Sequence, residues 1–422
     1  MDIIANYGNV LIILAIVFGV FMAWGIGAND VANAMGTSVG SGAVTIKQAI
    51  IIAVIFEFSG AILAGGEVTA TIRKGILDAA LFTNDPHLLV YGMMASLLAA
   101  GSWLLIASSF GWPVSTTHSI VGAIVGFGAV GVGVDAVAWG KVIKIVISWI
   151  ASPVLAGIIS FTLFRSLQNL IIDTQDPFNN AKKYVPYYMF LVGFIVSLVT
   201  IFKGLKHVGL SFSTSTSYLL SLGFGLLVAI IGTLMIRNIH LNPDENIDFH
   251  FTSMERVFGV LMIITAAAMA FAHGSNDVAN AIGPLAAIYS VIESGGAIGS
   301  KSALPLWILL VGGAGIVVGL VTYGHRVIAT IGTGITQLTP SRGFAATLAA
   351  AATVVIASGT GIPVSTTQVL VGAVLGVGLA RGMAALDTRV INRIFLSWIV
   401  TLPAGALMSI LFFFALKGAF GA

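Results

Sequence analysis

The sequence has no cysteine and few charged residues. Only 8% of its 422 residues are Asp, Glu, Lys or Arg, whereas soluble globular domains carry about 25%. The absence of cysteine excludes disulfides, thiol catalysis and thiolate metal sites, and it leaves the cellular compartment open. The 19 basic residues are dispersed, with at most two in a row, and form no dense patch, so we predict no nucleic-acid partner.

Hydrophobic residues make up 58% of the chain, and its mean hydropathy is +1.04. A helix that crosses the hydrocarbon layer needs about 20 apolar residues and satisfies its own backbone hydrogen bonds. The sequence therefore predicts an all-α polytopic membrane protein of about twelve transmembrane segments, with the lipid bilayer as a partner. The apolar stretches lie at 8–27, 48–65, 88–110, 117–134, 142–164, 186–202, 217–236, 257–273, 304–324, 344–358, 364–380 and 394–417.

Two motifs occur twice in the same order. GANDVANAMG at 27–36 recurs as GSNDVANAIG at 274–283, with eight of ten residues identical. The stretch 111–128, which contains Pro-Val-Ser-Thr-Thr, recurs at 361–378 with eleven of eighteen residues identical. The offsets are 247 and 250, so the chain contains an internal repeat.

The repeat predicts three parts: a first repeat at 1–165, a central linker with two transmembrane helices at 166–256, and a second repeat at 257–422. Equivalent apolar segments are seven apart, and an odd offset inverts the second copy across the membrane. Inverted repeats with broken helices and a midplane site are typical of secondary transporters. The inversion fails if the segments 117–134 and 364–380 re-enter the membrane without crossing it.

Asp30 and Asp277 occupy the same position in the two copies of the first motif, after long apolar runs. A carboxylate at membrane depth costs roughly 2.5–3.5 kcal/mol and marks an ion pathway by default. The alternative is an interfacial Asp that caps a helix start. Because the residue is duplicated, we predict that both Asp side chains bind sodium.

Other polar side chains complete the predicted sodium site. Carboxylate and amide oxygens suit a hard cation, whereas amide nitrogens can donate to an anion. Glu57 lies within an apolar segment without an acidic counterpart in the second repeat, and three roles stay open for it: cation ligand, proton relay, or partner of a base such as Arg73. Besides the two aspartates, the predicted sodium ligands are Asn33, Asn280 and Glu57.

The Pro-Val-Ser-Thr-Thr runs indicate a helix stop followed by a new helix start. A helix N-terminus offers unpaired N–H groups and the positive end of its dipole to an anion. Plain hydroxyl capping is the alternative, and duplication favours an anion site. The predicted phosphate-binding residues are Ser115, Thr116, Thr117, Ser365, Thr366, Thr367, Asn29 and Asn276.

No Lys or Arg lies well inside a predicted span. An anion bound beside two carboxylates at low dielectric then requires mobile cations for charge balance. We therefore predict cation-coupled uptake, with sodium as the coupling ion and no organic cofactor. The chain shows no nucleophile with a base at recognisable spacing, so we predict no enzyme. His273 is predicted to make a structural hydrogen bond.

With these motifs the chain resembles the inorganic phosphate transporter (PiT) family, from Gly25 to about Trp398. The resemblance implies sodium- or proton-coupled phosphate symport, an inverted repeat, about twelve crossings and both termini outside. It implicates Asn29, Asp30, Asn276, Asp277, Glu57 and the two Ser-Thr-Thr runs. The long central loop of animal members is missing here, which indicates a compact prokaryotic version.

The sequence thus predicts sodium-coupled phosphate symport by alternating access across the cell (inner) membrane. Proton coupling, sulfate transport on the same scaffold and an anion channel remain alternatives. If the N-terminus lies outside, the inner loops hold eleven of the nineteen Lys and Arg residues, which favours that orientation. Assembly as a homo-oligomer stays open.

Overall fold

The computed structural model describes residues 3–202, 204–240, 247–298, 304–325, 328, 338–382 and 388–421. Within these ranges the chain forms helices and no β-strand, apart from one isolated bridge between Leu77 and Val137. The predicted all-α class is confirmed. The α-helices are α1 (Ile3–Gly40), α2 (Ile46–Ala64), α3 (Gly66–Lys74), α4 (Pro86–Ser109), α5 (Thr116–Phe127), α6 (Trp139–Leu167), α7 (Pro177–Phe202), α8 (Thr214–Arg237), α9 (Ile247–Glu293), α10 (Leu306–Gly319), α12 (Pro340–Gly359), α13 (Thr366–Arg381) and α14 (Thr388–Phe420).

Each of the twelve predicted apolar stretches lies within a helix or extends no more than two residues beyond its end. Ten helices of the described chain are long and apolar enough to cross a membrane. The other two, Thr116–Val132 and Thr366–Arg381, are shorter apolar helices. At 1.5 Å per residue each of these helices is shorter than a hydrocarbon core of about 30 Å. The described chain thus contains ten long apolar helices and two short ones.

The helix interruptions lie before α5 and α13. In both places the chain leaves a long helix, turns through a glycine with positive φ, and starts the short helix a few residues later. Gly111 has a φ of 66° and Gly361 a φ of 73°, a left-handed conformation that glycine adopts without steric cost. The prediction of broken helices is thus confirmed at the two Pro-Val-Ser-Thr-Thr runs.

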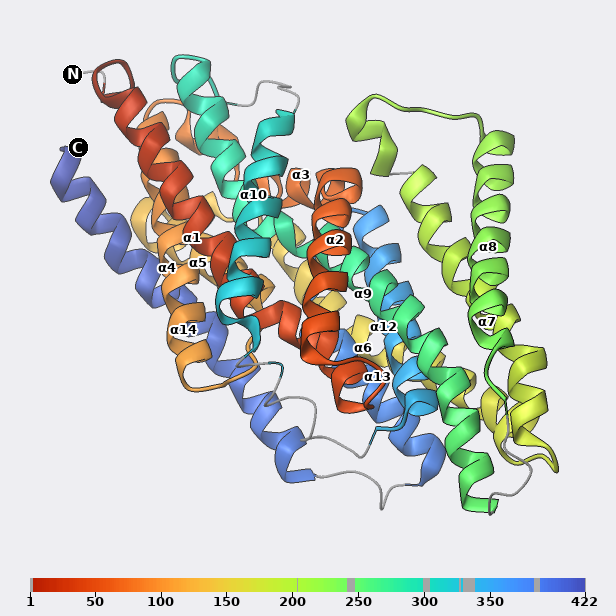
Figure 1. Ribbon diagram of the computed structural model, residues 1–422. Coiled ribbons are helices and arrows are strands. Elements are labelled where there is room, and N and C mark those ends of the chain that lie inside the picture. The colour runs from red at the N-terminus through yellow and green to blue at the C-terminus, as the bar shows by residue number, and fades with distance from the viewer. Residues whose placement is uncertain are drawn as a thin grey trace.

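The two most polar stretches between apolar segments, 173–183 and 237–255, are partly helical. α7 begins at Pro177, within the first stretch, and α9 begins at Ile247, within the second. α7 and α8 pack against each other and form a pair at one side of the bundle (Figure 1). The N- and C-terminal ends of the chain lie at the same end of the bundle (Figure 1).

α1 and α9 contain the two Asn-Asp motifs and pack against each other in the centre of the bundle. α1 also packs closely on α10 through glycines. A Cβ atom on Gly27 would lie 1.9 Å from the carbonyl oxygen of Ile316, and one on Gly319 would lie 2.0 Å from that of Trp24. Small residues at such crossings let helix backbones approach in a membrane.

We therefore expect Gly27→Ala to destabilise the protein by about 1–3 kcal/mol, the usual cost of overpacking a core. The apparent melting temperature of the purified protein in detergent measures this effect. Gly223→Ala in α8 is the matched control, because nothing lies within 4 Å of a Cβ built there. Equal melting temperatures for the two variants would contradict the close α1–α10 packing.

Candidate functional site

Asp30 and Asp277 lie inside uninterrupted helices. α1 continues for ten residues beyond Asp30, and α9 continues for sixteen beyond Asp277. Neither Asp caps a helix start, so the alternative reading of the two residues as caps is wrong. Their exposed fractions are 1% and 0%. Each carboxylate is therefore removed from bulk water and depends on partners from other helices.

The helices α5 and α13 each begin with a capping serine. Ser115 Oγ accepts a hydrogen bond from the backbone N–H of His118 at 3.2 Å, and Ser365 Oγ accepts one from that of Gln368 at 3.3 Å. These are N-cap bonds, which satisfy one of the free N–H groups at a helix start. Both serines are thus occupied in holding the helix starts.

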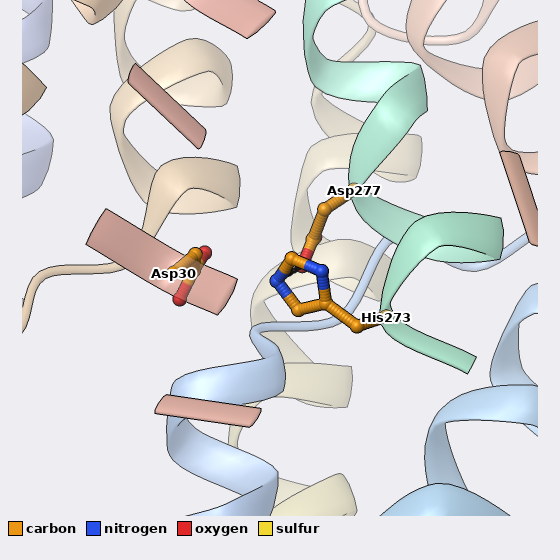
Figure 2. Close-up of side chains that lie close together, drawn as sticks. All are labelled: Asp30, His273 and Asp277. Atoms are coloured by element: carbon orange, nitrogen blue, oxygen red, sulfur yellow. Dashed lines mark ion pairs between the residues drawn. The ribbon is translucent and has the colours of Figure 1, made fainter. Parts of the chain in front are cut away.

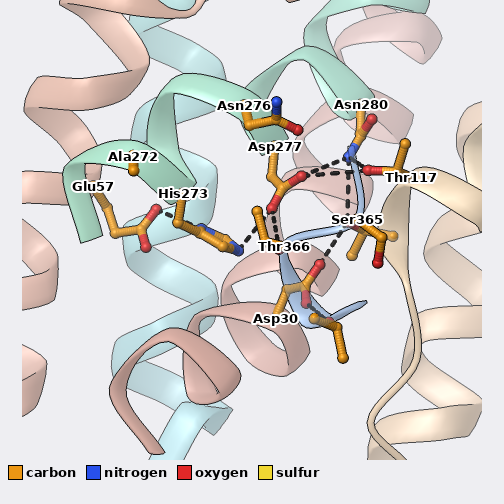
Figure 3. A network of polar contacts seen from close by, with 12 residues as sticks. Asp30, Glu57, Thr117, Ala272, His273, Asn276, Asp277, Asn280, Ser365 and Thr366 are labelled. Carbon is orange, nitrogen blue, oxygen red and sulfur yellow. Dashed lines mark hydrogen bonds and ion pairs between the residues drawn. The ribbon is translucent and has the colours of Figure 1, made fainter. Parts of the chain in front are cut away.

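The threonine hydroxyls connect the two halves crosswise. Asp30 accepts hydrogen bonds from Thr116 at 2.6 Å and from Thr367 at 2.5 Å. Asp277 accepts them from Thr366 at 2.8 Å and from Thr117 at 3.4 Å. Each carboxylate therefore contacts one threonine from its own half of the chain and one from the other half (Figure 3).

The asparagines that precede Asp30 and Asp277 donate hydrogen bonds to groups other than the two carboxylates. Asn29 donates to Ser108 Oγ at 2.8 Å and to the carbonyl oxygen of Trp112 at 3.1 Å. Asn276 donates to Ser358 Oγ at 3.2 Å. Both amides thus hold the chain just before α5 and α13.

Asn280 lies closer to the acids and is one residue of the predicted sodium site. Its Nδ2 donates to Asp277 Oδ1, Thr116 Oγ1 and Thr117 Oγ1, each at 3.2 Å. Its Oδ1 is buried and has no hydrogen-bond partner among the described residues. The side chain of Asn33, also predicted as a sodium ligand, lies outside the part that the structure describes.

Glu57 and Asp277 are joined through His273. His273 Nδ1 lies 2.9 Å from Glu57 Oε2, and His273 Nε2 lies 2.9 Å from Asp277 Oδ2. All three side chains are buried. Arg73, one of the partners considered for Glu57, donates instead to Ser290 Oγ. Glu57 thereby joins the Asp cluster through an imidazole.

Figure 2 shows Asp30, His273 and Asp277 pointing toward one another. One ligand atom from each of the three lies within 4.8 Å of the others. Carboxylate oxygens suit a small hard cation. The buried polar side chains of the described chain include no Lys or Arg. The buried basic side chains of the described chain are thus two histidines, His118 and His273.

Most of the predicted site residues lie in contact with one another, and His273 has a role that the sequence did not predict. Asp30, Asp277, Asn280 and the four threonines form one network (Figure 3). His273, predicted to make a structural hydrogen bond, bridges two acids. The signal for that bridge was present in the sequence, because His273 and Asp277 are four residues apart and share a helix face.

Comparison with known proteins gives concordant matches along the chain. The profile of the Phosphate transporter family matches residues 26–409. A putative phosphate permease of Haemophilus influenzae is 54% identical over 420 residues and matches 100% of both chains. The chloroplastic inorganic phosphate transporter 2-1 of Arabidopsis thaliana is 44% identical, covering 94% of this chain and 70% of the relative.

A solved structure, described as the sodium-dependent phosphate transporter, superposes with a TM-score of 0.89 at 40% identity, covering 97% of this chain and 99% of that one. These relatives are transporters and permeases, and none is an enzyme. The family profile covers far more than half of the sequence. The chain is therefore a multi-pass membrane protein that belongs to the phosphate transporter family.

Proposed function

We propose that this protein is a sodium-coupled phosphate symporter in which Asp30 and Asp277 bind sodium and the threonines at the starts of α5 and α13 bind phosphate. The observation that carries the proposal is the crossed network of the two buried carboxylates and four hydroxyls. The name of the structural neighbour, a sodium-dependent phosphate transporter, supports sodium as the coupling ion.

The charge of the site favours cation coupling. Asp30 and Asp277 are buried, and a bound phosphate adds one or two further negative charges. Two unit charges 4 Å apart interact by about 4 kcal/mol at an effective dielectric constant of 20. Because the site has no Lys or Arg among its described neighbours, cations that enter with phosphate supply the balance. Each sodium ion that crosses also couples uptake to the membrane potential.

The threonines suit phosphate because they can change partners. In the present arrangement the hydroxyls donate to Asp30 and Asp277. When sodium binds the carboxylates, the same hydroxyls become free to donate to phosphate oxygens. The N-termini of α5 and α13 add the N–H groups and positive dipole ends that anions favour. For Asn29 and Asn276 to contact phosphate, their amides would exchange the bonds that now hold the two turns.

The two repeats would supply the alternating access. Thr116 and Thr366 each contact the Asp of their own half, and Thr117 and Thr367 each contact the Asp of the other. This reciprocal pattern of contacts supports the division into repeats at 1–165 and 257–422 with a linker at 166–256. We further propose an inner-membrane location with both termini outside, which is consistent with their place at one end of the bundle (Figure 1).

Proton coupling is the second candidate, and the His273 bridge favours it. Both ring nitrogens of His273 face a carboxylate oxygen at 2.9 Å. The Nδ1 contact is a hydrogen bond, whereas Nε2 lies at ion-pair distance from Asp277 without hydrogen-bond geometry, so a proton added to the ring or to an acid would strengthen the second contact. The trio is thus able to take up a proton beside the sodium ligands.

Phosphate uptake into proteoliposomes separates these functions. We expect an inward sodium gradient to drive accumulation of labelled phosphate, and an equal potassium gradient to drive none. Accumulation driven by a pH gradient without sodium would favour the proton-coupled function. Loss of uptake on addition of excess sulfate would show a site for tetrahedral oxyanions in general. Equilibration without accumulation under every gradient would contradict symport and indicate a channel.

A further inference from the structure

A second site lies beside the crossed network, on the outside of the bundle. α6, α13 and α14 border a groove of about 770 Å³. Its walls are side chains spaced along three helices, and none of its lining residues is Asp, Glu, Lys or Arg. On α6 the wall residues Val146, Ile150, Val154 and Ile158 recur every four residues and thus share one helix face.

The groove opens toward the bilayer. Ile150 is 68% exposed, Ile158 60% and Ile399 70%, and all three lie on helices able to cross the membrane. The groove is centred on Pro153, the middle residue of α6. Only a molecule dissolved in the membrane can reach it at that depth. We call it the lateral groove.

The floor of the lateral groove is polar. It is formed by His118, Gln368 and Trp398, which are 4%, 5% and 7% exposed. Both ring nitrogens of His118, Gln368 Oε1 and Trp398 Nε1 are buried and make no hydrogen bond of good geometry among the described residues, although the ring of His118 lies close to the side chain of Gln368 and the backbone of Trp398. A buried polar atom left unpaired is costly, so this floor favours an occupant that offers hydrogen bonds.

The position of the floor connects it with the crossed network. His118 follows Thr117 in α5, and Gln368 follows Thr367 in α13. The ring of His118 also lies against that of Trp149, with 3.9 Å between the ring centroids. An occupant would thus touch α5, α6, α13 and α14 together, at the residues that follow two of the four threonines.

We propose that the lateral groove binds an uncharged, single-chain amphiphile from the bilayer, with its polar group on His118, Gln368 and Trp398 and its chain along α6 and α13. A charged phospholipid headgroup does not fit, because the floor lies at mid-membrane depth and has no Lys or Arg. A second copy of this chain would bring an apolar helix face and leave the polar floor unpaired. This proposal does not depend on the transported substrate.

Photolabelling tests the proposal directly. The probe is a hexadecanol that carries a diazirine near its hydroxyl group, added to the full-length protein in phosphatidylcholine vesicles. We expect label on peptides from 146–161 and 368–379, and we expect a small excess of plain hexadecanol over the probe to remove it. A diazirine-carrying hexadecane should label these peptides weakly and without saturation.

Two pairs of variants sharpen the test. Ile158→Trp fills the groove and should reduce the saturable label at least fivefold, whereas Ile147→Trp, on the same helix and 57% exposed outside the groove, should leave it unchanged. Gln368→Leu and Trp398→Phe should each weaken hexadecanol competition about three- to tenfold, the usual effect of one lost hydrogen bond. Melting temperatures of the variants verify that they fold.

Three outcomes would overturn the proposal. The first is label in the groove no stronger than on the lipid-facing helix α8. The second is equal labelling of the Ile158→Trp and Ile147→Trp variants. The third is cross-linking between two copies of the chain through residues of the groove, which would make it a dimer interface.

Discussion

Asp30→Asn and Asp277→Asn are each expected to reduce sodium-driven phosphate uptake by at least about 100-fold, which corresponds to about 2.8 kcal/mol. The reason is the loss of a charge that holds sodium beside phosphate at low dielectric. Asn keeps the shape of Asp and one acceptor oxygen, so one of the two threonine bonds of Asp30 can persist and the other can reverse, with the amide N–H donating to the hydroxyl oxygen. The variants should therefore fold and lose function.

Initial rates of labelled phosphate uptake in proteoliposomes measure this effect. Asp85→Asn is the matched control, because Asp85 is exposed and its side chain makes no capping bond at the start of α4. We expect Asp85→Asn to transport normally. Normal uptake by Asp30→Asn and Asp277→Asn would remove both residues from the sodium site.

Thr367→Val is expected to raise the phosphate concentration for half-maximal uptake by about 10- to 100-fold. A hydrogen bond to a charged group contributes about 1.5–3 kcal/mol, and Val keeps the volume of Thr without its hydroxyl. The hydroxyl of Thr367 approaches Asp30 more closely than any other of the four threonines approaches its Asp. Thr367→Ser, which restores the hydroxyl, should restore most of the affinity.

The control for this variant is Thr353→Val in α12. Thr353 is also buried, but among the described residues its hydroxyl donates only to the carbonyl oxygen of Ala349 in its own helix. Thr353→Val should change the half-maximal concentration less than twofold. An equal change in both variants would show that any buried threonine has this effect, and would contradict a phosphate contact by Thr367.

Much of this architecture could be predicted from the chain alone. The apolar stretches predict the long helices because backbone groups in lipid leave few other structures. The duplicated motifs point to Asp30 and Asp277, because a repeated acid in an apolar context has no cheap structural explanation. The proline before each Ser-Thr-Thr run predicts the helix interruptions.

Contacts between the halves could not be predicted. Thr367 and Asp30 are 337 residues apart, and nothing in either motif specifies the crosswise partner. The bridge from Glu57 to Asp277 depends on α2 packing beside α9, which periodicity does not reveal. From the sequence, Asp30 and Asp277 could also be interpreted as helix caps, because Asn, Asp and small residues are common where a helix starts. In the structure these polar side chains bond to neighbouring helices, so α1 and α9 continue.

Equilibrium binding of labelled phosphate to the purified protein, measured across sodium concentrations at constant ionic strength with choline, tests the central claim most directly. If cations balance the charge of the site, sodium must raise the affinity for phosphate, and phosphate must raise the affinity for sodium by the same factor. We expect at least a tenfold increase between sodium-free and saturating conditions. An affinity for phosphate that does not change with sodium would contradict the account.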